Sequence, residues 1–251
     1  MQGGNTLSTP MQPCLKLSKD DCPKSDAEKA EMAKVLYSSA VGSLMYAMVT
    51  TRPDIAIVVG VVSRYMANPG KNHWNAVKRL LRYLKGTASK CLRFENSEAS
   101  IVGYTDADYA GCSDTRKSTF SYVFLVVKAA VSWRSVLQTC TSSSTTESEY
   151  VAASSASKEA VWLARLVGEL GIHQISVLHC DSQSAITLAK NPVFHSKTKH
   201  IEVQYHVVRN ILTTKRIELI KVHTDDNSAD ALTKNLTSER FTHCSAIMDI
   251  R

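Results

Sequence analysis

The stretch "IVGYTDADYAG", residues 101–111, decides the fold, because an apolar run ends there in carboxylates. Ile101, Val102 and Tyr104 predict a buried β-strand, and Asp106 stands where that strand should end. Two further apolar runs, "TFSYVFLVV" (119–127) and "AAVSWRSVLQ" (129–138), follow closely enough to form a meander with it. The sequence therefore predicts the first three strands of a sheet, with an acid at the end of the first.

The elements after this meander alternate between helix and strand. We expect a helix over 145–171, a strand over 176–182, helices over 182–190 and 200–214, a strand over 217–223 and a last helix over 227–236. This order predicts an α/β fold with a mixed sheet. If the first and fourth strands are parallel neighbours, Asp106 and Asp181 lie side by side, and a hard cation such as Mg²⁺ or Mn²⁺ would offset their repulsion.

The long helix offers two further acids, Glu147 and Glu149, and helical periodicity distinguishes them. Helical spacing from Glu149 gives an unbroken apolar stripe: Ala153, Ala156, Ala160, Leu163, Val167 and Leu170. The same spacing from Glu147 gives a mixed face: Val151, Ser154, Lys158, Val161, Arg165 and Gly168. The apolar stripe should pack on the sheet, so we predict that Glu149 faces the other acids and keep Glu147 as the alternative.

The first hundred residues differ from the rest in composition. Residues 1–26 are rich in Pro, Gly, Ser, Thr and Lys, and we expect helices over 26–50, 53–69 and 71–86. The stretch from Ile55 to Phe94 holds eight Lys or Arg and no Asp or Glu. It is either a solvated helix face or a phosphate-binding surface, and the formal charge of +7 suits a polyanionic partner. The candidate contacts are Lys71, Lys78, Arg79, Arg82 and Lys85.

The composition also excludes several classes of protein. A chain with 44% hydrophobic residues can bury a core, and no segment suggests a membrane span. Seven cysteines without a C-x-x-C pair fit neither a zinc ribbon nor a disulfide framework, so we expect a reducing, cytoplasmic compartment. His195, His200 and His206 lack the i, i+4 spacing of a helical zinc site.

Several motifs carry a resemblance to a known family. The stretches "YTDADYAG", "SWRS", "STTESEYVAAS", "KEAVWL", "CDSQSAITLAKNPVFHSKTKHIEVQYHVVR" and "NSADALTK" resemble the RNase H domain of copia-type retrotransposon Pol polyproteins. The stretches "YSSAVGSLMYAMVTTRPDIA", "VGVVSRYMANPGKNHW" and "AVKRLLRYLKGT" resemble the segment after the reverse transcriptase palm of the same polyproteins. The polymerase's own Tyr-x-Asp-Asp motif does not occur in the sequence.

The resemblance implies a domain organisation and a fold. Residues 27–98 would be a small, mainly helical reverse transcriptase tail, 99–240 the RNase H domain and 241–251 a tail. The composition of residues 1–26 predicts a flexible lead-in before them. The domain would have an RNase H-like mixed five-stranded sheet flanked by helices. Expected partners are an RNA–DNA hybrid and, if expressed together, the rest of Pol (palm and integrase), with no membrane. The expected location is the cytoplasm, in a virus-like particle for an intact element, and the sequence does not exclude the nucleus.

The resemblance also implies a catalytic site, made of Asp106, Glu149, Asp181 and Asp230. These acids would hold two Mg²⁺ ions, or Mn²⁺ instead, for hydrolysis of the RNA strand of a hybrid. Asp106 would bridge both ions, and Asp230 would help to hold the ion that activates water. Glu149 and Asp181 would hold the ion at the leaving 3′ oxygen. The further residues expected to face nucleic acid are Lys197, Lys199, His200 and Arg209.

Two places depart from the family pattern, which has a glycine before the aromatic residue of the second strand and a Gly-Gly turn after that strand. Here these places read Ser121 and "VKAA" (127–130), and no glycine occurs between Gly111 and Gly168. A non-catalytic nucleic-acid-binding remnant of a degenerate element is therefore the alternative hypothesis. A transposase or integrase of this fold is disfavoured, because that class places its Glu after both strand aspartates.

Overall fold

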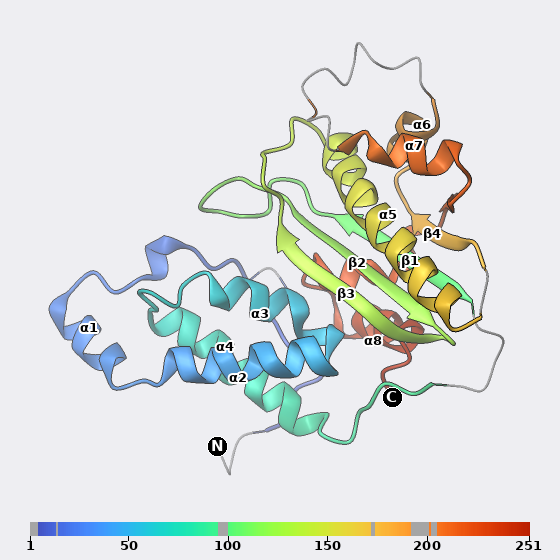
Figure 1. Cartoon of the computed structure of the whole chain (residues 1–251). Coiled ribbons are helices and arrows are strands. Elements are labelled where there is room, and N and C mark those ends of the chain that lie inside the picture. Colours follow the sequence, from blue (N-terminus) through green and yellow to red (C-terminus); the bar gives the residue numbers. More distant parts are fainter. Residues whose placement is uncertain (1–4, 14, 95–99, 172–173, 192–200, 202–204) are drawn as a thin grey trace.

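A mixed five-stranded sheet forms the centre of the protein (Figure 1). The structure is a computed structural model, and it describes residues 5–13, 15–94, 100–171, 174–191, 201 and 205–251. The strands are β1 (Ile101–Ala107), β2 (Thr119–Val126), β3 (Ala129–Leu137), β4 (Ser176–Cys180) and β5 (Ile217–Lys221). Their order is β3-β2-β1-β4-β5, with β1 antiparallel to β2 and parallel to β4. The expected α/β fold and the parallel pairing of the first and fourth strands are confirmed.

Among the described residues, the helices that cover one face of this sheet are α5 (Thr145–Glu169), α6 (Gln183–Lys190) and α7 (Val207–Thr213). Alternate residues of β2 point into this layer, including Phe120, Tyr122 and Phe124. Gly103 of β1 lies under the Phe124 ring, where a Cβ atom would come within 2.3 Å of a ring carbon. This glycine therefore allows the aromatic ring to lie flat on the neighbouring strand.

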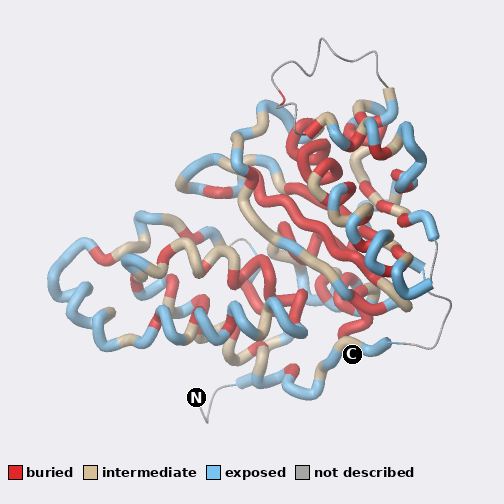
Figure 2. The backbone as a smooth tube through the Cα atoms, viewed as in Figure 1, coloured by how far each residue is buried: buried red, intermediate tan, exposed pale blue. Residues whose placement is uncertain are grey.

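The N-terminal helices cover the opposite face, together with the C-terminal elements η6 (Ser228–Leu232) and α8 (Ser238–Ile247). Val123 and Leu125 of β2 share one hydrophobic cluster with these helices. Figure 2 shows the central strands β1 and β2 mostly buried between the two layers. Trp133 of β3 donates its indole N–H to the carbonyl oxygen of Met48, at 3.0 Å. The helical segment and the sheet therefore share a core instead of forming separate ones.

The N-terminal segment contains α1 (Asp26–Ala33), α2 (Tyr37–Thr50), η2 (Pro53–Ile55), α3 (Ala56–Ser63) and α4 (Lys71–Gly86). The single helix expected over 26–50 is wrong, since α1 and α2 meet at an angle of 53°. No buried residue lies in α1, whereas α2 buries Tyr37, Val41 and Leu44 on α3 and α4. Among the described residues, no single helix has the length and apolarity to cross a membrane, and the bent α1–α2 pair meets these criteria only jointly, by length and composition.

A buried ion pair explains the "TRPDIA" motif. The Arg52 guanidinium donates two hydrogen bonds to Asp54, at 2.9 and 2.7 Å, and the Tyr83 hydroxyl donates a third to Asp54, at 2.5 Å. Arg52 also donates to the Thr87 carbonyl oxygen, at 3.2 Å. The motif therefore joins the start of η2 to the end of α4, and its charges are paired as buried charges must be.

Both ends of the chain are more ordered than the sequence indicated. Within the expected lead-in, Leu17 is buried and its carbonyl oxygen accepts a hydrogen bond from the Tyr65 hydroxyl, at 2.9 Å. The residues expected as a tail continue α8 and bury Phe241 and Met248. The last helix expected over 227–236 is instead the short 3-10 helix η6.

Candidate metal centre

Three acids from distant parts of the chain meet at the end of β1 and β4. Asp106 is fully buried near the end of β1, Asp181 follows β4 directly and Asp230 lies in η6. Because the parallel register pairs Thr105 with Cys180, the residues after them reach the same edge of the sheet. One carboxylate oxygen from each of Asp106, Asp181 and Asp230 lies within 4.8 Å of the others. Such a group of oxygens is a candidate site for a divalent cation.

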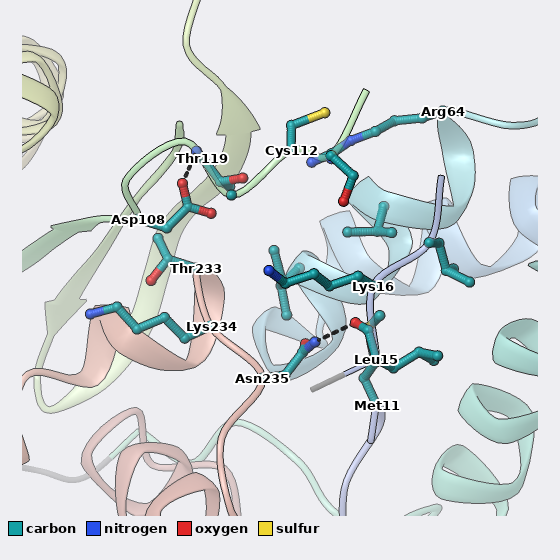
Figure 3. A pocket seen from close by; sticks show the side chains of 15 residues that line it. Met11, Leu15, Lys16, Arg64, Asp108, Cys112, Thr119, Thr233, Lys234 and Asn235 are labelled. Carbon is teal, nitrogen blue, oxygen red and sulfur yellow. Dashed lines mark hydrogen bonds between the residues drawn. The ribbon is translucent and has the colours of Figure 1, made fainter. Parts of the chain in front are cut away.

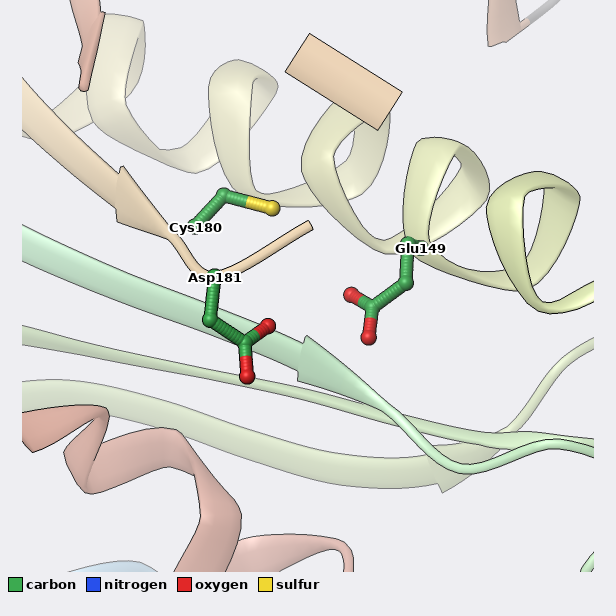
Figure 4. A group of neighbouring side chains, drawn as sticks. All are labelled: Glu149, Cys180 and Asp181. Atoms are coloured by element: carbon green, nitrogen blue, oxygen red, sulfur yellow. The ribbon is translucent and has the colours of Figure 1, made fainter. Parts of the chain in front are cut away.

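Glu149, near the start of α5, supplies a fourth carboxylate. Figure 4 shows its side chain facing Asp181 across the end of β4, and its oxygen, the Cys180 sulfur and an Asp181 oxygen lie within 4.8 Å of one another. Only 8% of Glu149 is exposed, and within the described parts of the chain its Oε2 has no hydrogen-bond partner. Glu147 instead accepts hydrogen bonds from the amide and hydroxyl of Ser143, at 2.7 and 2.6 Å. The structure thus brings Glu149, and not Glu147, toward the other acids.

Burial and mutual repulsion favour the protonated forms of these carboxyl groups. Desolvation raises the pKa of Asp106 to about 7; Lys234 opposes this shift and Asp230 adds to it. Desolvation, then the charges of Asp106 and Asp181, raise the pKa of Glu149 to about 9. Raised pKa values of this kind mark a cluster whose ionised form needs a cation. Burial likewise raises the pKa of the Cys180 thiol, so this side chain stays neutral.

Hydrogen bonds from the sheet hold η6, and with it Asp230, in place. Ser121 of β2 donates its hydroxyl to the Ala229 carbonyl oxygen at 2.9 Å, and Ser135 of β3 donates to the Leu232 carbonyl oxygen at 2.5 Å. Asn227 donates its side-chain amide to the Thr105 carbonyl oxygen, at 3.1 Å. The serine that departs from the family pattern thus has a partner here, which the sequence did not reveal.

Basic residues contact the acid cluster from the segment after η6 and from α8. The Lys234 ammonium lies 3.1 Å from Asp106 Oδ1 and 3.0 Å from Asp230 Oδ1, and the Thr233 hydroxyl donates to Asp106 Oδ2. Arg240 Nη2 donates to Asp230 Oδ2, at 2.8 Å. Sequence reasoning missed Lys234, although its position four residues after Asp230 places the two side chains close together. Burial alone would lower the pKa of Lys234, but the charges of Asp106 and Asp230 outweigh it and raise that pKa.

A pocket of about 280 Å³ adjoins the cluster at Thr233 and Lys234 (Figure 3). It lies between the N-terminal segment, which contributes Lys16, and the loop after β1, which contributes Asp108. Asp108 Oδ1 accepts a hydrogen bond from the Thr119 amide at 2.6 Å, and burial raises the pKa of Asp108. This acid therefore fixes the loop between β1 and β2.

The predicted nucleic-acid contacts fall into three groups. Lys71, Lys78, Arg79, Arg82 and Lys85 all lie on α4. Of these, Arg79 donates to the Thr9 hydroxyl at 3.0 Å, which ties α4 to the residues that precede α1. Arg209 lies 5.9 Å from the Tyr150 ring centre and donates to the Leu188 carbonyl oxygen, at 3.4 Å. The predictions for Lys197, Lys199 and His200 fall outside the described residues.

The side chains at the centre suit a hard divalent cation. The three aspartates and Glu149 offer only oxygen ligands, the set that Mg²⁺ and Mn²⁺ prefer. A buried carboxylate oxygen without a partner, such as Oε2 of Glu149, requires an explanation, and a bound cation would satisfy it. The fold and the site together define an α/β protein with a candidate carboxylate metal centre.

Comparison with known proteins identifies the family. The chain is 52% identical to the retrovirus-related Pol polyprotein from transposon TNT 1-94 of Nicotiana tabacum, over 99% of this chain and 19% of that protein. It is 40% identical to the Pol polyprotein from transposon RE2 of Arabidopsis thaliana, over 83% of this chain and 14% of that protein. The chain belongs to the retrovirus-related Pol polyproteins of copia-type transposons, and it spans less than a fifth of the length of these relatives.

Other comparisons cover smaller parts. The secreted RxLR effector protein 161 of Plasmopara viticola is 50% identical over 133 residues, which make up 53% of this chain and 94% of that protein. Among solved structures, the N-terminal RNase H domain of rv2228c from Mycobacterium tuberculosis matches with a TM-score of 0.38 and 14% identity, over 59% of this chain and 98% of that one. No family model matches the chain.

Proposed function

We propose that this chain is the RNase H segment of a copia-type Pol polyprotein, joined to the end of its reverse transcriptase, and that it hydrolyses the RNA strand of RNA–DNA hybrids. The observation that carries the proposal is the convergence of Asp106, Asp181 and Asp230 within 4.8 Å, with Glu149 adjoining Asp181. These residues come from β1, α5, the end of β4 and η6. Lys234 and Arg240 offset part of the charge of Asp106 and Asp230. Among the described residues no ion pair reaches Glu149 or Asp181, and an ionised Glu149 beside the aspartates would be stabilised by a bound cation.

The four acids would divide the task of holding two divalent ions, Mg²⁺ or Mn²⁺. When bound, such ions stabilise charge on the scissile phosphate and generate the nucleophile from water. Asp106 would serve both ions, because its oxygen lies within 4.8 Å of those of Asp181 and Asp230 and its charge also acts on Glu149. Asp181 and Glu149 would serve one of them, and Asp230 the other. The sheet, and η6 through its hydrogen bonds to the sheet, hold these side chains in place before substrate binds. This limits the reorganisation that catalysis requires.

The basic residues of α4 would contribute phosphate contacts. Lys71 and Lys85 lie on exposed positions of this helix, and Lys78 and Arg82 are half-buried. Side chains of this kind bind the nucleic-acid backbone without reading its sequence. They support binding of a long hybrid alongside the catalytic domain.

Cleavage of a labelled RNA–DNA hybrid tests the proposal. We expect the full chain to cleave the hybrid only when Mg²⁺ is present. The cleavage rate should fall by more than about 100-fold in Asp106→Asn and in Glu149→Gln, which is more than the loss expected when a residue only orients a metal ligand. Glu147→Gln is the matched control, because it changes an acid two residues away whose carboxylate bonds to Ser143. Equal losses in Glu147→Gln and Glu149→Gln would contradict the assignment.

A second candidate function, nucleic-acid binding without catalysis, is favoured by the turn between β2 and β3. Val127 and Lys128 both have positive φ angles, 53° and 65°, which side chains other than glycine adopt at a cost. Such strain suits a copy that has lost selection for activity. Hybrid binding by the full chain with no cleavage in Mg²⁺ or Mn²⁺ would support this alternative.

A further inference from the structure

We propose that the ammonium group of Lys234 takes the place of one divalent cation in the centre, so that metal binding between Asp106 and Asp230 must displace it. The inference rests on the proposed function, because it assigns a role to a residue of that same site. It predicts that the two cation positions differ in affinity. It also predicts that the acids stay assembled when no metal is bound.

The position of the ammonium is the main support. Lys234 Nζ lies 3.1 Å from Asp106 Oδ1 and 3.0 Å from Asp230 Oδ1. It therefore bridges two buried carboxylates whose oxygens are also within 4.8 Å of Asp181. A cation at this point offsets their repulsion, which is what a metal ion would do there.

In the part of the chain that the structure describes, no ammonium or guanidinium group forms an ion pair on the other side of the cluster. Among the described residues, the ion pairs at the centre run from Lys234 to Asp106 and Asp230 and from Arg240 to Asp230, and none reaches Glu149 or Asp181. Oε2 of Glu149 has no hydrogen-bond partner in that part of the chain. Within the described residues, a metal ion bound by Glu149 and Asp181 would thus displace no ion-paired side chain, whereas one bound by Asp230 would compete with Lys234.

The pocket beside the cluster and the solvent both offer space for the Lys234 side chain when a metal ion displaces it. Its side chain is 39% exposed, and in Figure 3 it extends from the rim of the pocket, away from Lys16 and Arg64. The same pocket is lined by the carboxylate of Asp108. Rotation of the flexible four-carbon stem would move the ammonium group from the acid cluster into the pocket or into solvent. Displacement therefore requires no movement of η6.

Metal titration by calorimetry, with Mn²⁺ as the probe and no nucleic acid present, tests the inference. The unmodified chain should show one stronger and one weaker binding event. In Lys234→Met, which removes the ammonium group but keeps a flexible side chain of nearly the same length, the weaker event should tighten by about tenfold or more, because a competing charge within about 4 Å is gone. Lys158→Met removes the same charge from an exposed position of α5, nine residues after Glu149, and should change neither event. An unchanged or weakened second event in Lys234→Met would overturn the inference.

A second measurement uses the native chain and does not depend on a variant that folds. Reductive methylation followed by mass spectrometry reports how accessible each lysine amine is. Lys234 should be protected in the metal-free protein and should react several-fold faster when Mn²⁺ saturates the centre, since the ammonium then leaves the carboxylates. Lys158 should react at the same rate in both conditions. A Lys234 rate that does not rise with Mn²⁺ would contradict the displacement.

The outcome is separable from that of the proposed function. If the chain binds Mn²⁺ with the expected Lys234 response but does not cleave a hybrid, the nuclease proposal fails and the inference stands. If the chain cleaves a hybrid but Lys234 neither competes with Mn²⁺ nor gains reactivity, the inference fails and the nuclease proposal stands.

Discussion

The hydroxyl of Ser121 donates a hydrogen bond to the carbonyl oxygen of Ala229, across 108 positions of the chain. Ser121 lies beside Asp106 in the pairing of β1 with β2, and Ala229 precedes Asp230 in η6. One hydrogen bond thus connects the strands that carry the first acid with the short helix that carries the last. Because the bond is fully buried, its loss leaves a carbonyl oxygen without its partner.

Ser121→Ala should therefore reduce the free energy of unfolding by about 1–3 kcal/mol. Chemical denaturation of the full chain measures this change. Ser155→Ala, at a half-buried position of α5, is a suitable comparison and should change stability far less. If both variants lower the free energy of unfolding by the same amount, the hydrogen bond to Ala229 does not contribute specifically to holding η6 on the sheet.

The turn between β2 and β3 offers a gain in stability. Val127 and Lys128 are the two loop residues of a hairpin in which Val126 pairs with Ala129, and both have positive φ. Asn and Gly are the residues preferred at such a pair of positions. Val127→Asn combined with Lys128→Gly should raise the free energy of unfolding by about 1–2 kcal/mol. Lys128→Ala keeps the unfavourable φ and should give no gain; a gain of equal size there would refute the strain account.

The sequence predicted the elements whose pattern is local. The apolar stripe that begins at Glu149 indicated which face of α5 packs on the sheet, and the acids at strand ends indicated the edge where they meet. The contact of Lys234 with Asp106 could not be predicted in this way, because it joins residues 128 positions apart and depends on how η6 lies on the sheet. The ordered C-terminus was missed, although Phe241, Cys244 and Met248 recur at helical spacing.

The raised pKa values predict a pH-dependent stability. The folded, metal-free chain holds the protons of Glu149 and Asp106 up to pH values of about 9 and about 7, whereas carboxyl groups of an unfolded chain release theirs near pH 4. The folded state thus binds more protons in this window, so the free energy of unfolding should fall as pH rises from about 4 to about 9. Thermal melting in EDTA should show a lower Tm at pH 8 than at pH 6. Mg²⁺ added in excess of the EDTA should raise the Tm by more at pH 8 than at pH 6.

Glu149→Gln provides the matching test of that slope. The amide carries no charge at any pH, so this variant should lose part of the pH dependence and should be more stable than the unmodified chain at pH 8 without metal. Glu147→Gln, two residues away, should keep the original slope. The interpretation is wrong if Glu149→Gln melts with the full pH dependence of the unmodified chain.

The shared core predicts that residues 99–251 do not fold well alone, even though the resemblance placed a domain boundary after residue 98. Val123, Leu125 and Trp133 would lose the helices that cover them, and an exposed apolar sheet face promotes aggregation. We expect the 99–251 fragment to aggregate on size-exclusion chromatography and to melt without a cooperative transition. In the full chain, Trp133→Phe should cost about 1 kcal/mol through the lost bond to Met48, whereas Trp162→Phe, at a side chain that is 54% exposed, should be nearly neutral. A soluble fragment that melts as cooperatively as the full chain would show instead that the helical segment is dispensable for the fold.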